Sequence, residues 1–364
     1  AGGIQNSHDR FSIPAFTPVI FNVCLIFAAV IIAPNFEMPI YALAWGVLLA
    51  GFLQLLIQYF PLSTINMLPR PVLNFENKGL KKFLLLIMPA ILAGGIIQIN
   101  ILIDTIFASL LETGSPTWLY VSDRLIQFPM GIFAIAIGTV LLPRLSKLDV
   151  GSQRQKFIDT LANSQSLVIF IGIPSLIGLV FCSEDLIAAI FLRGEFQPID
   201  VFRSSNSLIA FSFGLPFFML MKVLTPAFFA RKDTKTPMYV AFLALLLNAI
   251  LNYVLAFVFN FGHVGLAIGS SIAAFVSVLI LEFILFKNGL VYLKNLNYRF
   301  FIAIILSSTA LIIFLKFYTA FTDFMIMSQA ERFLYLGVEV IFSIIIYFSI
   351  ARLILGTSFI KQFN

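Results

Sequence analysis

Charged residues are scarce in this chain, and cysteine and histidine are almost absent. Asp, Glu, Lys and Arg make up 11% of the 364 residues, whereas a soluble domain has about a quarter. Cys24 and Cys182 lie within apolar runs, where they pack as small residues and indicate neither a disulfide nor a metal site. His8 and His263 are far apart and match no metal-ligand spacing. These counts exclude a soluble protein and a site built around a transition metal.

The chain also lacks the sequence signatures of common catalytic sites. It has no glycine-rich phosphate-binding loop, no nucleotide-binding motif and no nucleophile elbow. We therefore expect no enzyme, no ATP hydrolysis and no bound cofactor. The net charge of +6 and the pI near 9.3 would suit a nucleic-acid partner. In a membrane protein the same excess reflects Lys and Arg retained in cytoplasmic loops, so we expect no nucleic acid.

Long apolar runs fill the sequence instead. Hydrophobic residues make up 60% of the chain, and the mean hydropathy is +1.02. Continuous apolar runs of about 20 residues match the thickness of a bilayer core. We predict an all-α polytopic membrane protein with ten spans. By run length these spans are 14–34, 39–60, 82–111, 117–143, 161–182, 203–230, 236–259, 263–286, 299–320 and 331–355.

Lys and Arg gather on one side of these predicted spans. The side that holds both chain ends contains Arg10, Arg70, Lys78, Lys81, Lys82, Arg144, Lys147, Arg154, Lys156, Arg231, Lys232, Lys235, Lys287, Lys294, Arg299, Arg352 and Lys361. The loops on the opposite side hold Arg193, Arg203 and Arg332. Because cytoplasmic loops retain positive charge, we predict that both termini of this chain are cytoplasmic.

An internal repeat relates two parts of the chain. ALAWGVLLAGFLQ (42–54) aligns without gaps with GLAIGSSIAAFVS (265–277), and Pro14 and Pro237 match at the same offset. The first two spans would then repeat the seventh and eighth, so the repeat unit has six spans. An even number makes the two copies parallel.

This repeat predicts a two-lobe helical bundle with part of one lobe missing. We expect residues 1–60 to be the last two helices of an N-terminal lobe whose first four spans are absent. Residues 61–290 would form a complete six-helix lobe, and residues 291–364 would add two helices outside the repeat. The complete protein would have about fourteen spans.

Polar residues from four predicted spans lie at one depth. Asp104 and Asn252 come seven residues before the outer ends of their spans, and Arg124 and Ser270 come seven residues after theirs. At 1.5 Å per residue, all lie about 10 Å below the outer boundary. Because ionisable groups are costly in lipid, their shared depth indicates a cavity.

Arg124 is the candidate for binding an anionic substrate. Tyr120, Arg124, Gln127 and Gly131 follow helical spacing and form one polar stripe, with Asp123 beside it. A guanidinium offers a planar fork to phosphate oxygens, and Asp123 would orient Arg124 or bind a neighbouring span. The alternative is a buried ion pair between helices that only fixes packing.

Lys222 is a second candidate contact for an anionic substrate. It lies nine residues from the inner end of its predicted span, about 13 Å deep, which is beyond comfortable snorkelling. A structural ion pair is the alternative.

Four oxygen-bearing residues form a candidate cation site. Asn248 and Asn252 share a helix face, and with Asp104 and Ser270 they could surround Na⁺. Asp104 could instead carry a proton. The alternative is amide hydrogen bonding between helices, which is common in membranes.

Three segments resemble the MurJ/MviN family of lipid II flippases in the MOP exporter superfamily. They are NSHDRFSIPAFTPVIFNV (6–23), DTIFASLLETGSPTWLYVSDRLIQFPMGIFAIAIGTVLLPRLS (104–146) and MKVLTPAFFARKDTKTP (221–237). The resemblance covers essentially the whole chain, and the segment that ends in LLPRLS is highly specific. It implies two six-helix lobes plus two C-terminal helices that form a groove for the lipid tail. This chain would be the C-terminal ten spans.

The resemblance also implies a function. The family moves lipid-linked peptidoglycan precursor from the cytoplasmic to the periplasmic leaflet of the bacterial inner membrane by alternating access. Its cationic central cavity receives the diphosphate-sugar head. The arginine of the family's DRL segment matches Arg124, and the acidic residue before it matches Asp123. Many members have Glu where this chain has Gln127, which puts a carboxylate role there in doubt.

Coupling and partners are implied by the same resemblance. Asp104, Asn248, Asn252 and Ser270 correspond to a cation site proposed for some members. Coupling to Na⁺, to protons or to the membrane potential follows from the resemblance alone. The implied partners are lipid II or a similar polyprenyl-diphosphate-linked saccharide, membrane lipids and the cell-wall synthesis machinery.

Other functions remain open at this point. The protein could be another MOP exporter, such as a polysaccharide-lipid flippase or a cation-coupled multidrug antiporter. A drug antiporter exports cations and favours carboxylates in its cavity, whereas Arg124 and Lys222 are cationic. A non-transporting membrane scaffold would need no polar residues at a matched depth.

Overall fold

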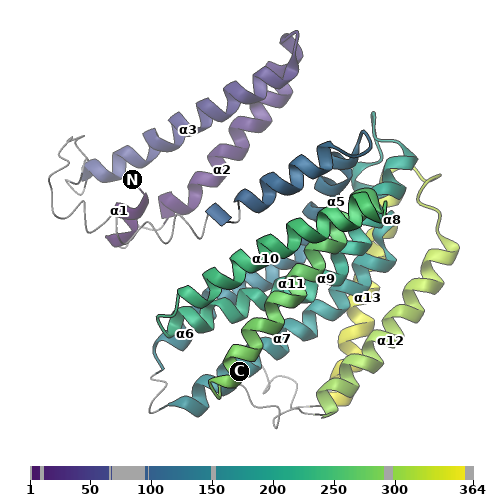
Figure 1. The fold of residues 1–364 in the computed structure, drawn as a ribbon. Helices are drawn as coiled ribbons and strands as arrows, with labels where there is room; N and C mark the ends of the chain where they lie inside the picture. The colour runs from purple at the N-terminus through teal and green to yellow at the C-terminus, as the bar shows by residue number, and fades with distance from the viewer. Residues whose placement is uncertain are drawn as a thin grey trace. The chain divides into compact units, whose positions relative to one another are not determined.

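A computed structural model shows that the regular elements of the described residues are all helices. The structure describes residues 2–8, 12–64, 67, 95–96, 98–148, 153–290 and 298–356. These fall into two compact units, residues 1–84 and 85–364. Figure 1 shows their ribbons, and each unit is described by itself.

Nine helical segments within the described residues are long and apolar enough to cross a membrane. They are Ser12–Asn35, Pro39–Thr64, Ser115–Ser146, Arg154–Phe181, Pro198–Ala230, Lys235–Val258, Gly262–Lys287, Tyr298–Phe321 and Gln329–Leu355. Nine of the ten predicted spans are therefore confirmed as helices of sufficient length. The described part of the predicted span 82–111 is the helix Gln98–Ser109, and its first part lies outside the described residues.

Unit 1 is a helical hairpin preceded by the short helix α1 (Gly2–Ser7). α2 (Ser12–Phe27) continues through a π-helical turn (Ala28–Ile32) and a 3₁₀ turn (Ala33–Asn35), and α3 (Pro39–Thr64) packs along it. Gly46 of α3 allows this close approach, because a Cβ atom there would lie 2.6 Å from the Cβ of Ala28. The side-chain amide of Gln54 also donates to the carbonyl of Thr17 at 2.9 Å.

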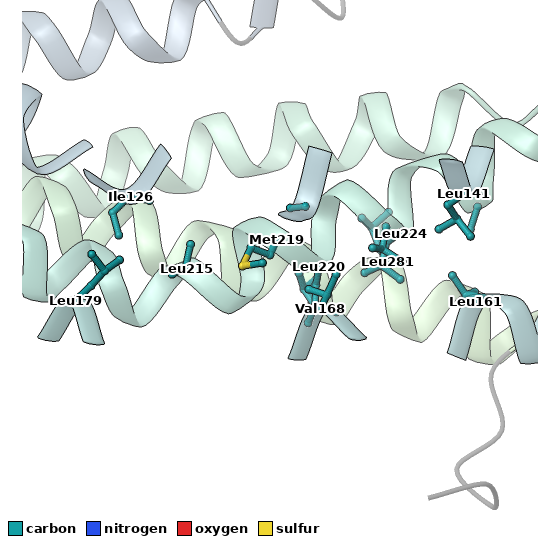
Figure 2. Close-up of a cluster of buried hydrophobic side chains, with 14 of the residues drawn as sticks. Ile126, Leu141, Leu161, Val168, Leu179, Leu215, Met219, Leu220, Leu224 and Leu281 are labelled. Atoms are coloured by element: carbon teal, nitrogen blue, oxygen red, sulfur yellow. The ribbon is translucent and has the colours of Figure 1, made fainter. Parts of the chain in front are cut away.

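Unit 2 is built around α9 (Pro198–Ala230), which is one of its two most buried spans. Three elements pack against α9: α7 (Arg154–Phe181), α11 (Gly262–Lys287), and the continuous helix made of α5 (Ser115–Pro129), the π turn Met130–Ile135 and α6 (Ala136–Ser146). Leu215, Met219 and Leu220 of α9 form the centre of the core. Figure 2 shows these side chains, with Val168 of α7 below Leu220 and Leu281 of α11 beside Leu224 in this view.

The other helices of unit 2 form two pairs. α10 (Lys235–Tyr253) continues through the π turn Val254–Val258 and packs along α11. α12 (Tyr298–Phe321) and α13 (Gln329–Leu355) run side by side, and they pack against α7 and the short helix α8 (Ser183–Phe191). The Tyr347 hydroxyl of α13 donates to the Phe170 carbonyl of α7 at 2.9 Å, within a second apolar core.

The two units share a local packing pattern at the positions of the internal repeat. Gly46 packs against Ala28 in unit 1, and Gly269 packs against Asn252 in unit 2. In both units the helix that the glycine contacts contains a π turn near its end. The recurrence supports the internal repeat, while the proposed boundaries at residues 60 and 290 remain predictions.

Candidate functional site

The four predicted cation-site residues meet in unit 2, between the helix Gln98–Ser109, α10 and α11. The side-chain amide of Asn252 donates to Asp104 Oδ1 at 2.6 Å, and Asn100 donates to Asp104 Oδ2 at 3.0 Å. Asn248 lies one turn before Asn252 on α10, with 2.9 Å between their side-chain amides. Asn248 also lies 3.0 Å from the Ser270 hydroxyl of α11.

The Asn248 amide satisfies the cluster best with its nitrogen turned toward Asp104. In this orientation Nδ2 lies 3.0 Å from Asp104 Oδ1 and 3.2 Å from Asn100 Oδ1. The amide oxygen then accepts from the Ser270 hydroxyl at 3.0 Å and from its backbone N–H at 3.2 Å. Asn248 therefore links the carboxylate to α11 through one amide group.

The two asparagine side chains of this cluster are buried. Asn252 is 0% exposed and Asn248 is 3% exposed, while Asp104 is half-buried. Asn252 Oδ1 is buried and has no hydrogen-bond partner within the described residues. A Cβ atom at Gly269 would collide with this same oxygen, so the glycine permits α11 to approach it.

The cluster offers the ligands that a hard cation prefers. A carboxylate, two amide groups and a hydroxyl are oxygen donors of the kind that bind Na⁺ and other hard cations. The Asn252 amide turns its nitrogen toward Asp104 and Asn248, and its buried oxygen packs against Gly269 without a hydrogen-bond partner in the described residues. Across the described ranges there is no group of three His, Cys, Asp or Glu side chains that could hold a transition metal.

Arg124 lies on an exposed face of α5, and its contacts come from its own helix. Its Cζ atom lies 4.6 Å from the centre of the Tyr120 ring, and Nη1 lies 3.4 Å from Gln127 Oε1. The Gln127 amide in turn donates to the Asp123 carboxylate. Tyr120, Arg124 and Gln127 are all exposed, as expected for one polar stripe.

The alternative reading of Arg124 as half of a buried interhelical ion pair finds no support here. Among the residues that the structure describes, no carboxylate lies within ion-pair distance of its guanidinium. Asp123 binds Gln127 four residues later and does not reach a neighbouring span within the described residues. The guanidinium is therefore held in place and remains accessible.

The two clusters lie at the same level of unit 2. Asp104 is close enough to Asp123 for their carboxylates to interact electrostatically. This proximity supports the polar layer predicted from residue counts along separate spans. The charge of a cation bound beside Asp104 would therefore change the electrostatic potential at Asp123, next to Arg124.

Lys222 is exposed on α9 and lies apart from both clusters. Its backbone carbonyl faces Gly138 of α6, where a Cβ atom would lie only 2.6 Å from the carbonyl oxygen. Arg124 precedes Gly138 on the same continuous helix, about 20 Å away at 1.5 Å per residue. The two cations therefore lie at different depths.

Sequence reasoning missed a network that positions α5. Trp118 Nε1 donates to Asp200 Oδ1 of α9 at 2.7 Å, and its ring meets that of His263 of α11 with 4.9 Å between centres. The hydroxyl of Ser207 of α9 lies 2.6 Å from His263 Nδ1. These contacts fix the rotation of α5 and so the direction of the arginine stripe.

Asn100 was missed as well, although the sequence holds a signal for it. Asn100 precedes Asp104 by four residues, as Asn248 precedes Asn252, so each pair shares a helix face. No comparable spacing marks Trp118 and Asp200, which lie on different helices.

Comparisons with known proteins agree with this geometry. Residues 1–334 match the family model described as lipid II flippase MurJ. The chain is 41% identical over 295 residues to the probable lipid II flippase MurJ of Vibrio cholerae, which covers 81% of this chain and 56% of that protein. It is 35% identical over 317 residues to the Haemophilus influenzae protein of the same description, covering 85% and 62%. The chain thus spans little more than half the length of these relatives.

Solved structures show the same fold. A lipid II flippase MurJ in an inward closed conformation superposes with a TM-score of 0.77 at 28% identity, covering 97% of this chain and 70% of that one. An outward-facing MATE multidrug transporter of the MOP superfamily gives a TM-score of 0.51 at 16% identity, over 76% of this chain, and shows the fold alone. The predicted MOP-type helical fold is confirmed, and the chain belongs to the MurJ family of lipid II flippases.

Proposed function

We propose that this protein moves lipid II, or a similar polyprenyl-diphosphate-linked saccharide, across the bacterial inner membrane by alternating access. The observation that carries the proposal is the exposed guanidinium of Arg124, which has no carboxylate within ion-pair distance in the described residues. A charge in a membrane span is costly unless a ligand or water meets it. A diphosphate headgroup supplies the complementary charge.

The neighbours of Arg124 suit it to this task. Tyr120 holds one face of the guanidinium, and Gln127 contacts one edge, which leaves other N–H groups to donate to phosphate oxygens. Hydrogen bonds to charged groups contribute about 1.5–3 kcal/mol each. Asp123 holds Gln127, so it acts as a positioning residue for the stripe.

Lys222 would provide a second contact for the same anion. It lies about 20 Å from Arg124 along the bundle, and both side chains are exposed. Two cations at different depths would meet a diphosphate in turn as it crosses. Under the proposed orientation, with both chain ends cytoplasmic, Lys222 is nearer the inner side and Arg124 nearer the outer side.

The cluster around Asp104 would couple transport to Na⁺ or to a proton. Asn248, Asn252 and Ser270 surround its carboxylate with further amide and hydroxyl groups, which supports a bound cation or proton at this place. Gly46, the repeat counterpart of Gly269, packs against Ala28, which has no side-chain oxygen, so in the described residues these ligands come together in unit 2. The membrane potential alone is the alternative driving force.

The domain assignments complete the proposal. Residues 1–60 would belong to the N-terminal lobe, residues 61–290 would be the C-terminal lobe, and residues 291–364 would form the groove for the lipid tail. The packing of α12 and α13 on α7 and α8, apart from the arginine stripe, supports a separate role for these two helices. Cell-wall synthesis enzymes are the proposed protein partners.

A charge-removal series at Arg124 tests the proposal. Arg124→Ala should lower transport at least about tenfold, because it removes charge-assisted hydrogen bonds to the substrate. Arg124→Lys should restore part of the activity, because it keeps the charge without the planar fork. The readout is the amount of lipid II that becomes accessible on the periplasmic side of cells that depend on this protein.

The control variant is Arg193→Ala, which removes an exposed arginine from a loop. It should transport normally, and all variants should be equally abundant in the membrane. Normal transport by Arg124→Ala would remove Arg124 from the mechanism and favour a scaffold. If Arg124→Ala lost export of drug cations and kept lipid II transport, the result would favour a multidrug exporter, the alternative left open by the sequence.

A further inference from the structure

A buried carboxyl group lies far from both clusters, on the face of α13 that packs against α7, α8 and α12. This face carries Arg332, Leu336, Glu339, Tyr347, Ala351 and Leu355 at helical spacing. Glu339 is 0% exposed, and neither of its carboxyl oxygens has a nitrogen or oxygen hydrogen-bond partner within the described residues; the Cys182 thiol, a weak donor, lies next to it. A polar group buried in this way normally has a partner, so Glu339 requires an explanation.

The surroundings of Glu339 contain no compensating positive charge. The nearest cation on α13 is Arg332, two turns away, and it donates to the carbonyls of Phe324, Met325 and Leu192. In the part of the chain that the structure describes, no Lys, Arg or His lies within ion-pair distance of Glu339. The groups that interact electrostatically with Glu339 are the Cys182 thiol, the Asp185 carboxyl of α8 and the Tyr318 hydroxyl of α12.

Unpartnered polar atoms gather at the same level of these helices. The buried hydroxyls of Ser307, Ser308 and Ser343 also have no partner, so five of the ten such side-chain atoms in the described residues belong to α12 and α13. Ser307 lies fourteen residues before the end of α12, and Ser343 lies fourteen residues after the start of α13. In an antiparallel pair these two positions lie at about the same depth, and Glu339 lies one turn closer to the loop that joins the helices.

The charge state of Glu339 follows from these neighbours. An ionised carboxylate without a partner is very costly in an apolar core, whereas a neutral carboxyl group is far cheaper and also donates an O–H. We propose that Glu339 is a proton-binding site: it carries a proton while α12 and α13 are docked, and its deprotonation weakens their contact with α8. The proposal holds whichever lipid the protein carries.

Asp185 provides the route between this site and water. It lies in the first turn of α8, is half-buried and interacts with Glu339. Burial raises the pKa of Asp185 to about 7, and the carboxylates of Glu184 and Asp323, and of Glu339 when it is ionised, contribute to the rise. Asp185 therefore exchanges protons near neutral pH. When both carboxyl groups are ionised, their repulsion acts directly across the contact between α8 and α13.

The sign of the pH dependence follows from linkage. The pKa of Asp185 is about 7 in the folded protein, above its ordinary value of 3.8. Such a raised pKa stabilises the folded state most below pH 3.8, and this stabilisation is lost as the pH rises through about 7. The groups that face Glu339 or Asp185 are Cys182, Glu184, Tyr318, Asp323 and, two turns away, Arg332. Cys182, Glu184, Tyr318 and Asp323 are neutral or negative, and Arg332 is two turns away. None of these groups therefore reverses the predicted loss of stability with rising pH.

Infrared spectroscopy of the intact protein in detergent, without added sodium, tests the site directly. The C=O stretching band of a protonated carboxylic acid should be present at about pH 7, and Glu339→Gln should lose the part of its intensity that belongs to Glu339, while Asp185 keeps a part. Asp185→Asn, which keeps Glu339, should retain a protonated-carboxyl band. Absence of this band from the wild-type protein, or an equally intense band in Glu339→Gln, would overturn the proposal.

A thermal measurement tests the consequence. Between about pH 5.5 and pH 8.5 the melting temperature of the wild type should fall. The melting temperature of Glu339→Gln should fall less, because Asp185 still ionises but has no carboxylate at position 339 to repel it. Glu195→Gln changes an exposed loop residue in the same way and should follow the wild type. Equal slopes for wild type and Glu339→Gln would contradict the proposal. So would a sodium-dependent rise of the wild-type melting temperature that Glu339→Gln lacks, because the bound ligand would then be a metal cation.

Discussion

Asp123 and Arg124 are neighbours in the sequence, but their side chains have different partners. Asp123 accepts a hydrogen bond from Gln127 one turn later, whereas Arg124 lies over Tyr120 one turn earlier. Because residues four apart share a helix face, these contacts form within α5 and leave the guanidinium exposed. A charge that its own helix holds in place is preorganised for a ligand and loses little freedom on binding.

At the same scale, Asn252 is the residue whose removal should change the response to a cation. Asn252→Ala removes the 2.6 Å hydrogen bond to Asp104 and the unpartnered amide oxygen. If Na⁺ binds here, the variant should lose the rise in melting temperature that Na⁺ produces in the wild type. Asn35→Ala, which alters an exposed amide bonded to Ile31, is the matched control. An unchanged response in Asn252→Ala would leave the cluster as helix packing.

At the scale of elements, close helix contacts depend on small residues. In a membrane the surrounding lipid is as apolar as a leucine side chain, so helices associate through tight packing and interhelical hydrogen bonds. Gly46, Gly138 and Gly269 each lie where a Cβ atom would meet a neighbouring helix at 2.6 Å or less. Gly46 and Gly269 contact the helical segments that begin with α2 and α10, and each of these segments has a π turn near its C-terminal end.

Gly138 provides a test of this packing. In Gly138→Ala the new methyl group would lie 2.6 Å from the Lys222 carbonyl oxygen, which belongs to the backbone and cannot rotate away. Overpacking of this kind costs about 1–3 kcal/mol, so the melting temperature in detergent should fall. Gly178→Ala is the control, because a Cβ atom there has nothing within 4 Å. Equal melting temperatures for the two variants would show that α6 and α9 can separate without cost.

At the scale of the whole molecule, the distribution of charge predicts the orientation in the membrane. Lys and Arg lie mainly in the loops on the side of the chain ends, and cytoplasmic loops retain these residues. A reporter that is active only in the cytoplasm should therefore be active when fused after residue 364. A periplasmic reporter, such as an alkaline phosphatase fused at the same place, should be inactive. The reverse pattern would invert the proposed direction of transport.

The sequence alone determined the membrane-spanning helices. In lipid every backbone N–H and C=O must be satisfied within its own segment, so an apolar run of about 20 residues folds as a helix whatever its neighbours are. Ser12–Asn35 and Pro39–Thr64 therefore match the predicted spans 14–34 and 39–60 closely. The depth of Asp104, Asn252, Arg124 and Ser270 followed from the same regular rise per residue.

Only the tertiary structure decided which side chains meet. The rotation of each helix about its axis is weakly encoded in a membrane, because both lipid and protein neighbours are apolar. The hydrogen bond of Trp118 with Asp200 and the electrostatic interaction of Glu339 with Asp185 therefore have no signature in the sequence. They arise where α5 packs on α9 and where α13 packs on α8, since packing fixes the rotation that hydropathy leaves free.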